Sequence, residues 1–210
     1  EEMAFDGILE NGILHTLALF DKPDPLTGPF FPETVYITPS RRPSSEQLRI
    51  QSAIASAAKT IGLAHGPIHA EVRIYDGEIY ILEIAARSIG GRCGKTLRFI
   101  GGYTLEDLIL NHALGVRGLS YQREPGAVGV MMIPVSEAGT LRAIDGLAPA
   151  REVKFVESVE ITVPIGQKVI PLPEGRQYLG FIFAKASRAA NAESALRNAF
   201  NELRILIEPS

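Results

Sequence analysis

An alternating pattern between residues 66 and 91 constrains the fold of this chain more than any other stretch. Two strand-like runs, 68–75 and 78–85, flank the dipeptide Asp76-Gly77. β-Branched and aromatic residues are frequent in both runs, and Asp-Gly is a turn signal, so the stretch predicts a β-hairpin. In the first run apolar residues share one face, whereas His69, Glu71 and Arg73 share the other.

The register of this hairpin decides whether its two inner acids meet. A two-residue loop would pair Glu71 with Leu82 and turn Glu83 to the opposite face. A three-residue loop, with Gly77 in the left-handed region, would pair Glu71 with Ile81 and place Glu83 diagonally on the same face. Diagonal neighbours lie roughly 7–8 Å apart. We predict the three-residue loop, because it lets the two carboxylates cooperate.

Two carboxylates on one face of a sheet predict either a metal site or a set of ion pairs. Mg²⁺ takes hard oxygen ligands, usually one or two carboxylates completed by phosphate oxygens and water. Glu71 and Glu83 fit that pattern, and Arg87 could neutralise a phosphate oxygen beside the metal. The alternative is cross-strand ion pairing of the same acids with Arg73 and Arg87, and the local sequence leaves both open.

A glycine-rich segment, Ser88-Ile89-Gly90-Gly91-Arg92-Cys93-Gly94-Lys95, follows the second strand. Gly90 and Gly91 let the backbone approach a ligand closely, and their N–H groups could hold an anion. The spacing of a Walker loop is absent. A plain loop is an equal alternative, and the notable feature of the segment is its position directly after the acidic strand.

Composition excludes several classes of protein. The net charge of −3 over 210 residues gives no basic field for nucleic acid. A single cysteine, Cys93, excludes an intramolecular disulfide framework and fits a reducing, cytoplasmic location. No apolar run approaches the ~20 residues of a membrane span, and no signal segment opens the chain.

The remaining pattern predicts an α+β protein with mostly antiparallel sheets. A turn at Asn11-Gly12 and a capping box of Ser44 with Gln47 are further signals. The buried stripe of that helix is expected to consist of Leu48, Ile54, Ala55, Ala58 and Ile61. The other expected strands are 3–9, 13–20, 33–38, 128–135, 140–144, 159–163, 167–171, 178–185 and 204–207. Helices are expected over 44–61, 105–114 and 192–201, and a long loop over 21–32. A linker near 120–126 divides the chain into domains 1–119 and 120–210.

At residues 69–91, HAEVRIYDGEIYILEIAARSIGG, the sequence resembles the C-terminal half of the ATP-grasp fold. In that superfamily two acids, matched here by Glu71 and Glu83, bind Mg²⁺ (or Mn²⁺) bridging the phosphates of ATP. The arginine, matched by Arg87, contacts phosphate or the acyl-phosphate intermediate. Ala85 stands where the family commonly has an Asn ligand, which leaves the occupancy of a second metal open.

The variant E-x-A-A-R resembles the L-amino acid ligase branch, a group of carboxylate–amine ligases. By that resemblance Glu2, in the opening E-M-A-F-D-G, is a ribose contact of ATP, and Lys22 lies in a substrate-side loop. The resemblance covers residues 1–115 well, and 128–210 resembles the small C-terminal subdomain of the branch. The glycine-rich lid and phosphate-binding lysines of the family are not in this stretch, so we expect a fragment with negligible ligase activity alone.

The leading hypothesis is therefore part of an ATP-dependent ligase that joins a carboxylate and an amine, such as two amino acids, through an acyl phosphate. Gly90 and Gly91 would bind the substrate carboxylate. A carbamoyl-phosphate-synthase-like or biotin-carboxylase-like enzyme that uses bicarbonate is an alternative. A non-catalytic binding module is another. The expected partners are small molecules, with no nucleic acid and no membrane; the sequence is silent on oligomeric state, so a homo-oligomer stays open.

Overall fold

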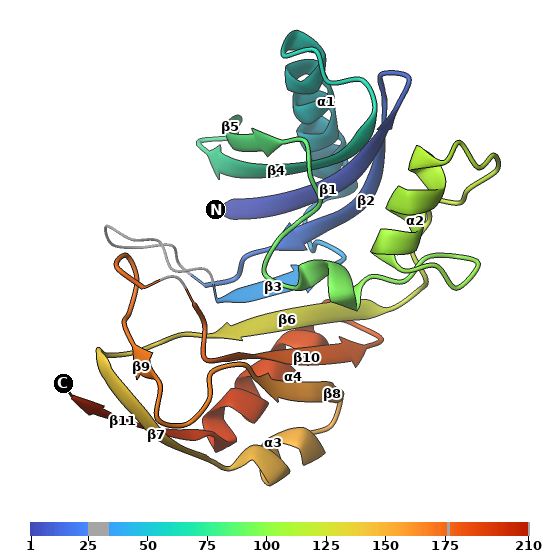
Figure 1. Cartoon of the computed structure of the whole chain (residues 1–210). Coiled ribbons are helices and arrows are strands. Elements are labelled where there is room, and N and C mark those ends of the chain that lie inside the picture. The colour runs from blue at the N-terminus through green and yellow to red at the C-terminus, as the bar shows by residue number, and fades with distance from the viewer. Residues whose placement is uncertain (25–33, 176, 210) are drawn as a thin grey trace. The chain divides into compact units, whose positions relative to one another are not determined.

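A computed structural model describes residues 1–24, 34–175 and 177–209 and shows an α+β protein, which confirms the predicted class (Figure 1). The chain divides into two compact units. Unit 1 comprises Glu1–Lys22 and Thr38–Pro125, and unit 2 comprises Pro23–Ile37 and Gly126–Ser210. The expected loop over 21–32 lies mostly outside the described residues.

Unit 1 is built on four antiparallel strands in the order β5-β4-β1-β2. The strands are β1 (Glu2–Glu10), β2 (Ile13–Asp21), β4 (Gly66–Tyr75) and β5 (Glu78–Ala85). The predicted turn at Asn11-Gly12 joins β1 to β2, and both of its residues have positive φ, 53° and 82°. Asparagine and glycine tolerate this conformation better than other residues do.

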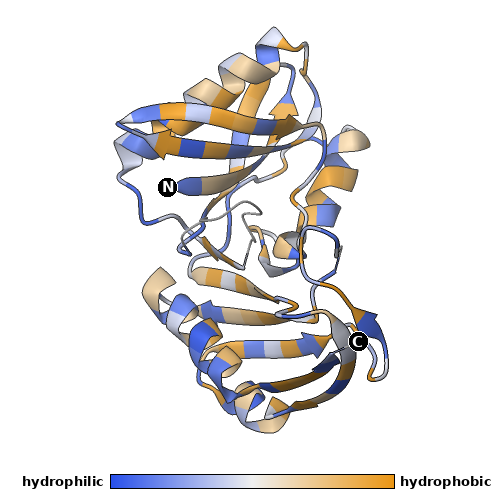
Figure 2. Cartoon of the chain, turned by 90° about the vertical axis from the view of Figure 1, so that its left-hand side faces the viewer, coloured by the Kyte–Doolittle hydropathy of each residue, from blue (hydrophilic) through white to orange (hydrophobic). Residues whose placement is uncertain are grey.

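Helix α1 (Ser44–Thr60) covers one face of this sheet. Its buried side chains, Ile50, Ile54 and Ala58, pack in one cluster with apolar residues of the strands, among them Phe5 and Val72. The opposite face carries the polar residues, because side chains alternate along each strand. Figure 2 shows hydrophilic and hydrophobic segments alternating along these strands.

Two expectations for α1 are wrong. Pro43, not Ser44, is the N-cap, and no side chain caps the helix; Gln47 instead donates its amide to the Arg42 carbonyl at 2.7 Å. Leu48 and Ile61 are exposed, because the buried stripe runs through Ile50, Ile54 and Ala58.

The segment after β5 connects the sheet to a second helix. It forms the short 3-10 helix η1 (Cys93–Thr96) and continues to α2 (Leu105–Ala113). Thr104 caps α2 in a capping box with Asp107: the Asp107 N–H donates to the Thr104 hydroxyl, and the Thr104 N–H donates to the Asp107 carboxylate.

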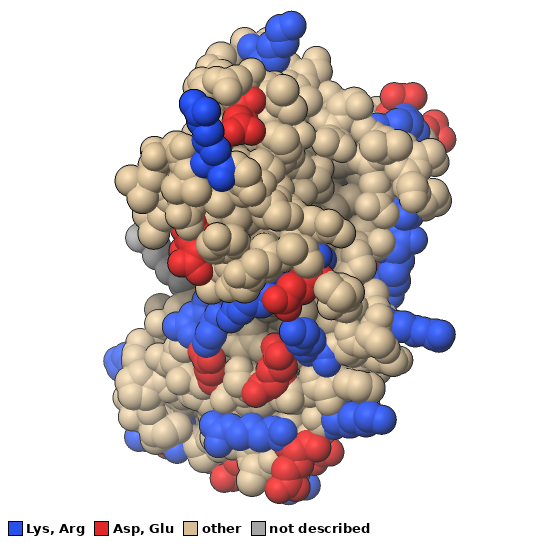
Figure 3. Space-filling model, turned by 90° about the vertical axis from the view of Figure 1, so that its right-hand side faces the viewer, with Lys and Arg blue, Asp and Glu red and all other residues tan. Residues whose placement is uncertain are grey.

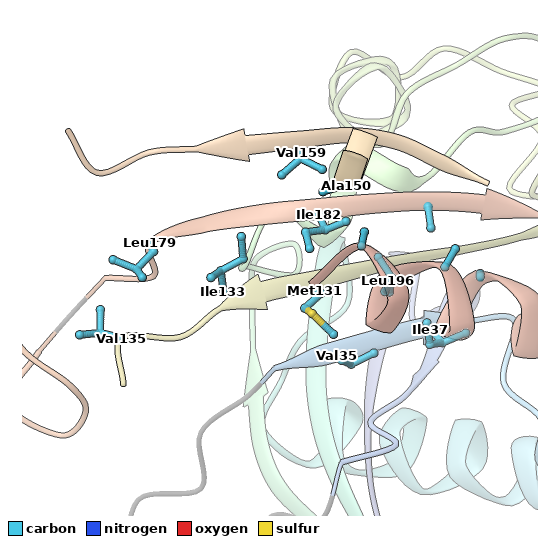
Figure 4. Close-up of a cluster of buried hydrophobic side chains, with 14 of the residues drawn as sticks. Val35, Ile37, Met131, Ile133, Val135, Ala150, Val159, Leu179, Ile182 and Leu196 are labelled. Carbon is cyan, nitrogen blue, oxygen red and sulfur yellow. The ribbon is translucent and has the colours of Figure 1, made fainter. Parts of the chain in front are cut away.

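Unit 2 contains strands in the order β3-β6-β10-β8 and a separate sheet, β11-β7-β9. Its elements are β3 (Val35–Thr38), β6 (Ala127–Ile133), β7 (Gly139–Asp145), α3 (Leu147–Glu152), β8 (Val156–Ile161), β9 (Lys168–Val169), β10 (Gly180–Ala186), α4 (Ala189–Glu202) and β11 (Arg204–Pro209). Figure 4 shows the apolar side chains of β3, β6, β10 and α4 that meet in its core, including Ile37, Met131, Ile182 and Leu196.

Candidate functional site

The structure places Glu71 and Glu83 directly opposite each other, through a hairpin register that differs from the predicted one. The predicted three-residue loop is wrong: Tyr75 pairs with Glu78, so the loop has two residues, Asp76-Gly77. A β-bulge then shifts the register between Val72 and Glu71. Leu82 is the extra residue of β5, so that Val72 pairs with Ile81 and Glu71 pairs with Glu83.

The bulge places both acids on the same face, because directly paired residues of antiparallel strands point to one side. A register without the bulge would have paired Glu71 with Leu82. Bulges re-aim side chains in this way at many functional sites. The bulge is visible in the sequence as a break in the two-residue period of β5. Ile79 and Ile81 are two residues apart, whereas Ile84 follows Ile81 after three. Leu82 is half exposed, as an unpaired extra residue would be.

Glu71 lies in the most enclosed part of this polar face, with 13% of its side chain exposed. Its carboxylate forms an ion pair with the ammonium of Lys22, whose side chain is 4% exposed. The other carboxylate oxygen lies 3.2 Å from Nε2 of His69. Nδ1 of His69 lies 3.1 Å from the Phe5 carbonyl, so the ring is held from both ends. These contacts fix the position of the Glu71 carboxylate.

Glu2 lies on the neighbouring strand of the same face. Its carboxylate accepts a hydrogen bond of 2.9 Å from Nε of Arg73, and its second oxygen lies 4.0 Å from the Lys22 ammonium. Lys22 therefore lies between two carboxylates, those of Glu2 and Glu71. The structure thus joins three of the residues singled out from the sequence in one enclosed charge network.

Glu83 and Arg87 lie at the open side of the face. Nη2 of Arg87 donates to Glu83 at 2.9 Å, and Nη1 donates to the Ser88 carbonyl at 3.0 Å. Both side chains are about half exposed, at 51% and 52%. An ion pair this exposed contributes little to stability. It leaves the carboxylate and the guanidinium accessible to a ligand from solvent.

Gly90 and Gly91 follow in a turn outside regular secondary structure. The Gly90 carbonyl accepts a hydrogen bond from the Cys93 N–H at 3.0 Å, and Gly91 has a φ of 57°. A Cβ added at Gly90 would meet no atom within 4 Å, so the backbone is open there. Within the described part of the chain, the N–H groups of Gly90 and Gly91 have no hydrogen-bond acceptor.

Asp6 is the polar residue of this face that the sequence reasoning missed. It lies in the middle of β1, pairs with His69 and is 1% exposed. Burial raises the pKa of its carboxyl to about 7, although the Ile89 N–H and the charges of His69 and Arg87 oppose that rise. An acid inside the apolar run Met3–Leu9 was the available signal, since such a residue needs a partner.

The arrangement suits a single divalent cation held by two carboxylates. Among the described residues, no group of three or more His, Cys, Asp or Glu side chains could hold a metal. Two carboxylate ligands completed by ligand phosphates and water are what Mg²⁺ commonly uses, whereas Ca²⁺ needs a larger oxygen cage. Glu71 and Glu83 could therefore hold Mg²⁺, and Lys22 and Arg87 could pair with phosphate oxygens.

Comparison with known families accounts for most of the chain. Residues 1–96 match the model of the ATP-grasp domain, and residues 131–208 match that of the L-amino acid ligase C-terminal domain 2. Residues 1–96 belong to the ATP-grasp family. The acidic hairpin of β4 and β5 lies within these matched residues.

Solved structures share the fold over almost the whole chain. The L-amino acid ligase from Bacillus licheniformis is 29% identical, has a TM-score of 0.84 and matches 99% of this chain over 52% of its own. Phosphoribosylglycinamide synthetase from Anaerococcus prevotii is 14% identical, with a TM-score of 0.77, and matches 99% of this chain over 53% of its own. The chain thus spans about half the length of these relatives.

The biotin carboxylase domain of Hydrogenobacter thermophilus 2-oxoglutarate carboxylase, solved with MgADP, ADP and bicarbonate, shares the fold. It is 17% identical, has a TM-score of 0.68, and matches 98% of this chain over 46% of its own. At that identity the likeness shows the fold alone. No curated protein matches the chain.

Two further features concern the surface and the helices of the chain. Figure 3 shows acidic and basic side chains interspersed on one face of the molecule. In the described part of the chain, no helix has both the length and the apolar character needed to cross a membrane.

Proposed function

We propose that this chain is the C-terminal half of an ATP-dependent carboxylate–amine ligase of the L-amino acid ligase branch. The observation that carries the proposal is the direct pairing of Glu71 with Glu83 beside Arg87, within the matched ATP-grasp domain. The 29% identity to a solved L-amino acid ligase supports this branch over the bicarbonate enzymes, whose likeness is 17%. Residues 1–119 would form the catalytic part and residues 120–210 the small C-terminal subdomain.

In the proposed reaction, a carboxylate oxygen of the first substrate attacks the γ-phosphorus of ATP, and ADP leaves. The amine nitrogen of the second substrate then attacks the acyl carbon. Phosphate leaves with the electrons of the acyl C–O bond, the amine loses a proton, and an amide forms. The substrates would be small carboxylates and amines, such as amino acids.

The residues of this chain would bind and orient the reactants. Glu71 and Glu83 would hold Mg²⁺, which when bound neutralises charge on the phosphate oxygens as a Lewis acid. The Arg87 guanidinium would stabilise charge that develops on the transferred phosphoryl group. The N–H groups of Gly90 and Gly91 would bind the substrate carboxylate.

Glu2 and Lys22 would complete the site. Glu2 would accept hydrogen bonds from the ribose of ATP, and Arg73 would hold its carboxylate in place. Lys22 would face the substrate, within reach of phosphate or carboxylate oxygens. The matched ligase is about twice as long as the part that this chain covers, so we expect no turnover from the 210 residues alone.

The test is ATP-dependent phosphate release by the full-length protein, screened against pairs of amino acids. We expect release that needs both a carboxylate and an amine substrate. Glu83→Gln should lower it by about 100-fold or more, because the substitution removes a charged ligand that stabilises phosphate charge. Glu78→Gln, an exposed acid of the same strand, is the matched control and should leave release unchanged.

A second measurement uses the 210-residue chain itself. Mn²⁺ should bind it and enhance water-proton relaxation, and Glu71→Gln and Glu83→Gln should each weaken that binding. Phosphate release that depends on bicarbonate instead of an amine would overturn the ligase assignment. Full phosphate-release activity of Glu83→Gln in the full-length protein would overturn the metal assignment.

A further inference from the structure

Asp6 makes a contact that links the sheet to the segment carrying Arg87 and the two glycines. Its Oδ1 accepts a hydrogen bond of 2.9 Å from the Ile89 N–H, and the bond is buried. Ile89 lies two residues after Arg87 and directly before Gly90. Residues 86–90 have no helix or strand of their own to hold them. The Asp6–Ile89 bond therefore fixes this segment at its middle.

The side chain of Ile89 strengthens the same attachment. It is 9% exposed, whereas Arg87 and Gly90 on either side of it are exposed. The segment is thus attached to the unit at Ile89 and turns outward on both sides. The backbone N–H of Ile89 determines how the neighbouring peptide groups are oriented.

The hydrogen bond to Ile89 uses only one of the two carboxyl oxygens of Asp6. Oδ2 of Asp6 has no hydrogen-bond partner among the described residues, although the side chain is 1% exposed. A buried polar atom without a partner costs free energy. Its neighbours on the paired strands are Ala18 and His69, and an apolar side chain would avoid this cost. Residues that lower stability without an evident gain are typical of functional sites.

We propose that Asp6 is a positioning residue, which holds residues 87–91 in the orientation that presents Arg87 and the Gly90 and Gly91 N–H groups to the ligand. What that segment binds rests on the proposed function. Asp6 itself touches no reacting atom, and it acts through the Ile89 N–H. The acceptor oxygen is the part of Asp6 that this role needs.

Amide hydrogen exchange and phosphate titration, both followed by NMR on the 210-residue chain, test the proposal. In the wild type the Ile89 amide should be protected from exchange. Asp6→Ala removes the acceptor, so the Ile89 amide should exchange at least about 10-fold faster. A tenfold change in the exchange rate corresponds to a loss of about 1.4 kcal/mol in the free energy of local opening. Asp6→Asn keeps an acceptor oxygen in the same place and should restore the protection.

The matched control is Asp107→Ala. Asp107 also accepts a backbone hydrogen bond through its carboxylate, from the Thr104 N–H, but it does so at the start of α2. Its removal should leave the exchange of Ile89 unchanged. The global free energy of unfolding, measured in urea for every variant, separates a local release of Ile89 from general destabilisation.

Inorganic phosphate supplies the second reading. It should shift the Gly90 and Gly91 amide signals in the wild type and in Asp6→Asn, and not in Asp6→Ala. An unprotected Ile89 amide in the wild type overturns the proposal without any variant, as does failure of Asp6→Asn to restore protection. If Ile89 depends on Asp6 but phosphate leaves the wild-type glycine signals unmoved, the anion role in the proposed function fails, and the attachment through Asp6 stands.

Discussion

Lys22 illustrates how strongly single residues of the site depend on one another. Its ammonium lies between Glu2 and Glu71 and is almost fully enclosed. Lys22→Met should lower the free energy of unfolding by about 1–3 kcal/mol, because Glu71 loses its counter-charge while still enclosed. Urea denaturation without metal measures this loss. Lys59→Met, at an exposed position in the last turn of α1, should change stability far less.

Mn²⁺ should then stabilise Lys22→Met more than it stabilises the wild type. The added cation supplies the positive charge that the variant lacks, and a ligand that binds only the folded state raises its stability. The comparison is the shift of the urea midpoint on addition of Mn²⁺. A larger shift in the wild type would show that Lys22 supports metal binding instead of competing with it.

Asp6 should give the stability of the chain a specific pH dependence. Its pKa lies near 7 in the folded chain against 3.8 ordinarily, so the folded state binds the proton more tightly than the unfolded state. Stability should therefore fall as pH rises from about 4 to about 7, and level off above that. Between pH 5 and pH 8, wild type should lose on the order of 3 kcal/mol relative to Asp6→Asn.

The free energy of unfolding at the two pH values, for both proteins, measures this difference. Asp107→Asn is the control, because the pKa of Asp107 is lowered by its bonds to Thr104 and its titration lies below this range. Equal slopes for wild type and Asp6→Asn would contradict the prediction.

The identities of the site residues could be predicted from the sequence more easily than their contacts. Glu71, Glu83 and Arg87 were recognisable because charged residues within alternating strands need partners. Asp6 carried the same signal, but its partner is the N–H of Ile89, 83 residues away. A contact between a side chain and a distant backbone group leaves no pattern in the sequence.

Among the secondary-structure elements, the hairpin of β4 and β5 allows the sharpest test. Deletion of Leu82 should remove the bulge, leave Val72 opposite Ile81 and bring Glu83 opposite Glu71 in a regular ladder. The chain should keep its Mn²⁺ binding, because the acids stay paired on one face. Insertion of one alanine after Leu82 should move Glu83 from its position directly opposite Glu71 and weaken that binding.

Water-proton relaxation by Mn²⁺ measures both variants, and circular dichroism confirms that each one folds. Mn²⁺ binding that survives the insertion would show that cross-strand pairing does not determine the site. Loss of binding on deletion of Leu82, with the fold intact, would show that the bulge itself shapes the metal ligands.

Elements with a clear period were predictable and those without one were not. The alternating strands of unit 1 and the capped helix α2 follow local rules that the sequence displays. Helix α3 was missed because it is six residues long and contains Pro149, which reads as a helix breaker. The hairpin loop was wrong because the extra residue lies within β5, where no glycine marks it.

At the scale of the whole molecule, the described residues of each unit form an apolar core. Ile54 belongs to the core of unit 1, Leu196 belongs to that of unit 2, and both are fully buried. Substitution of either by alanine should cost about 2–5 kcal/mol, because it removes buried methyl groups and leaves a cavity. Amide exchange should accelerate mainly in the unit that carries the substitution. Equal acceleration throughout the chain would show that the two cores unfold as one.

The bulge at Leu82 also separates the tip of the hairpin from the acids that follow it. The tip, from Ile74 to Ile79, is a regular two-residue hairpin whose pairing is independent of the register beyond the bulge. A reporter peptide, a fluorophore or a foreign epitope grafted between Asp76 and Gly77 would therefore leave the strand register at Glu71 unchanged. The hairpin tip is thus an attachment point for engineering that lies a few residues from the polar face of the sheet.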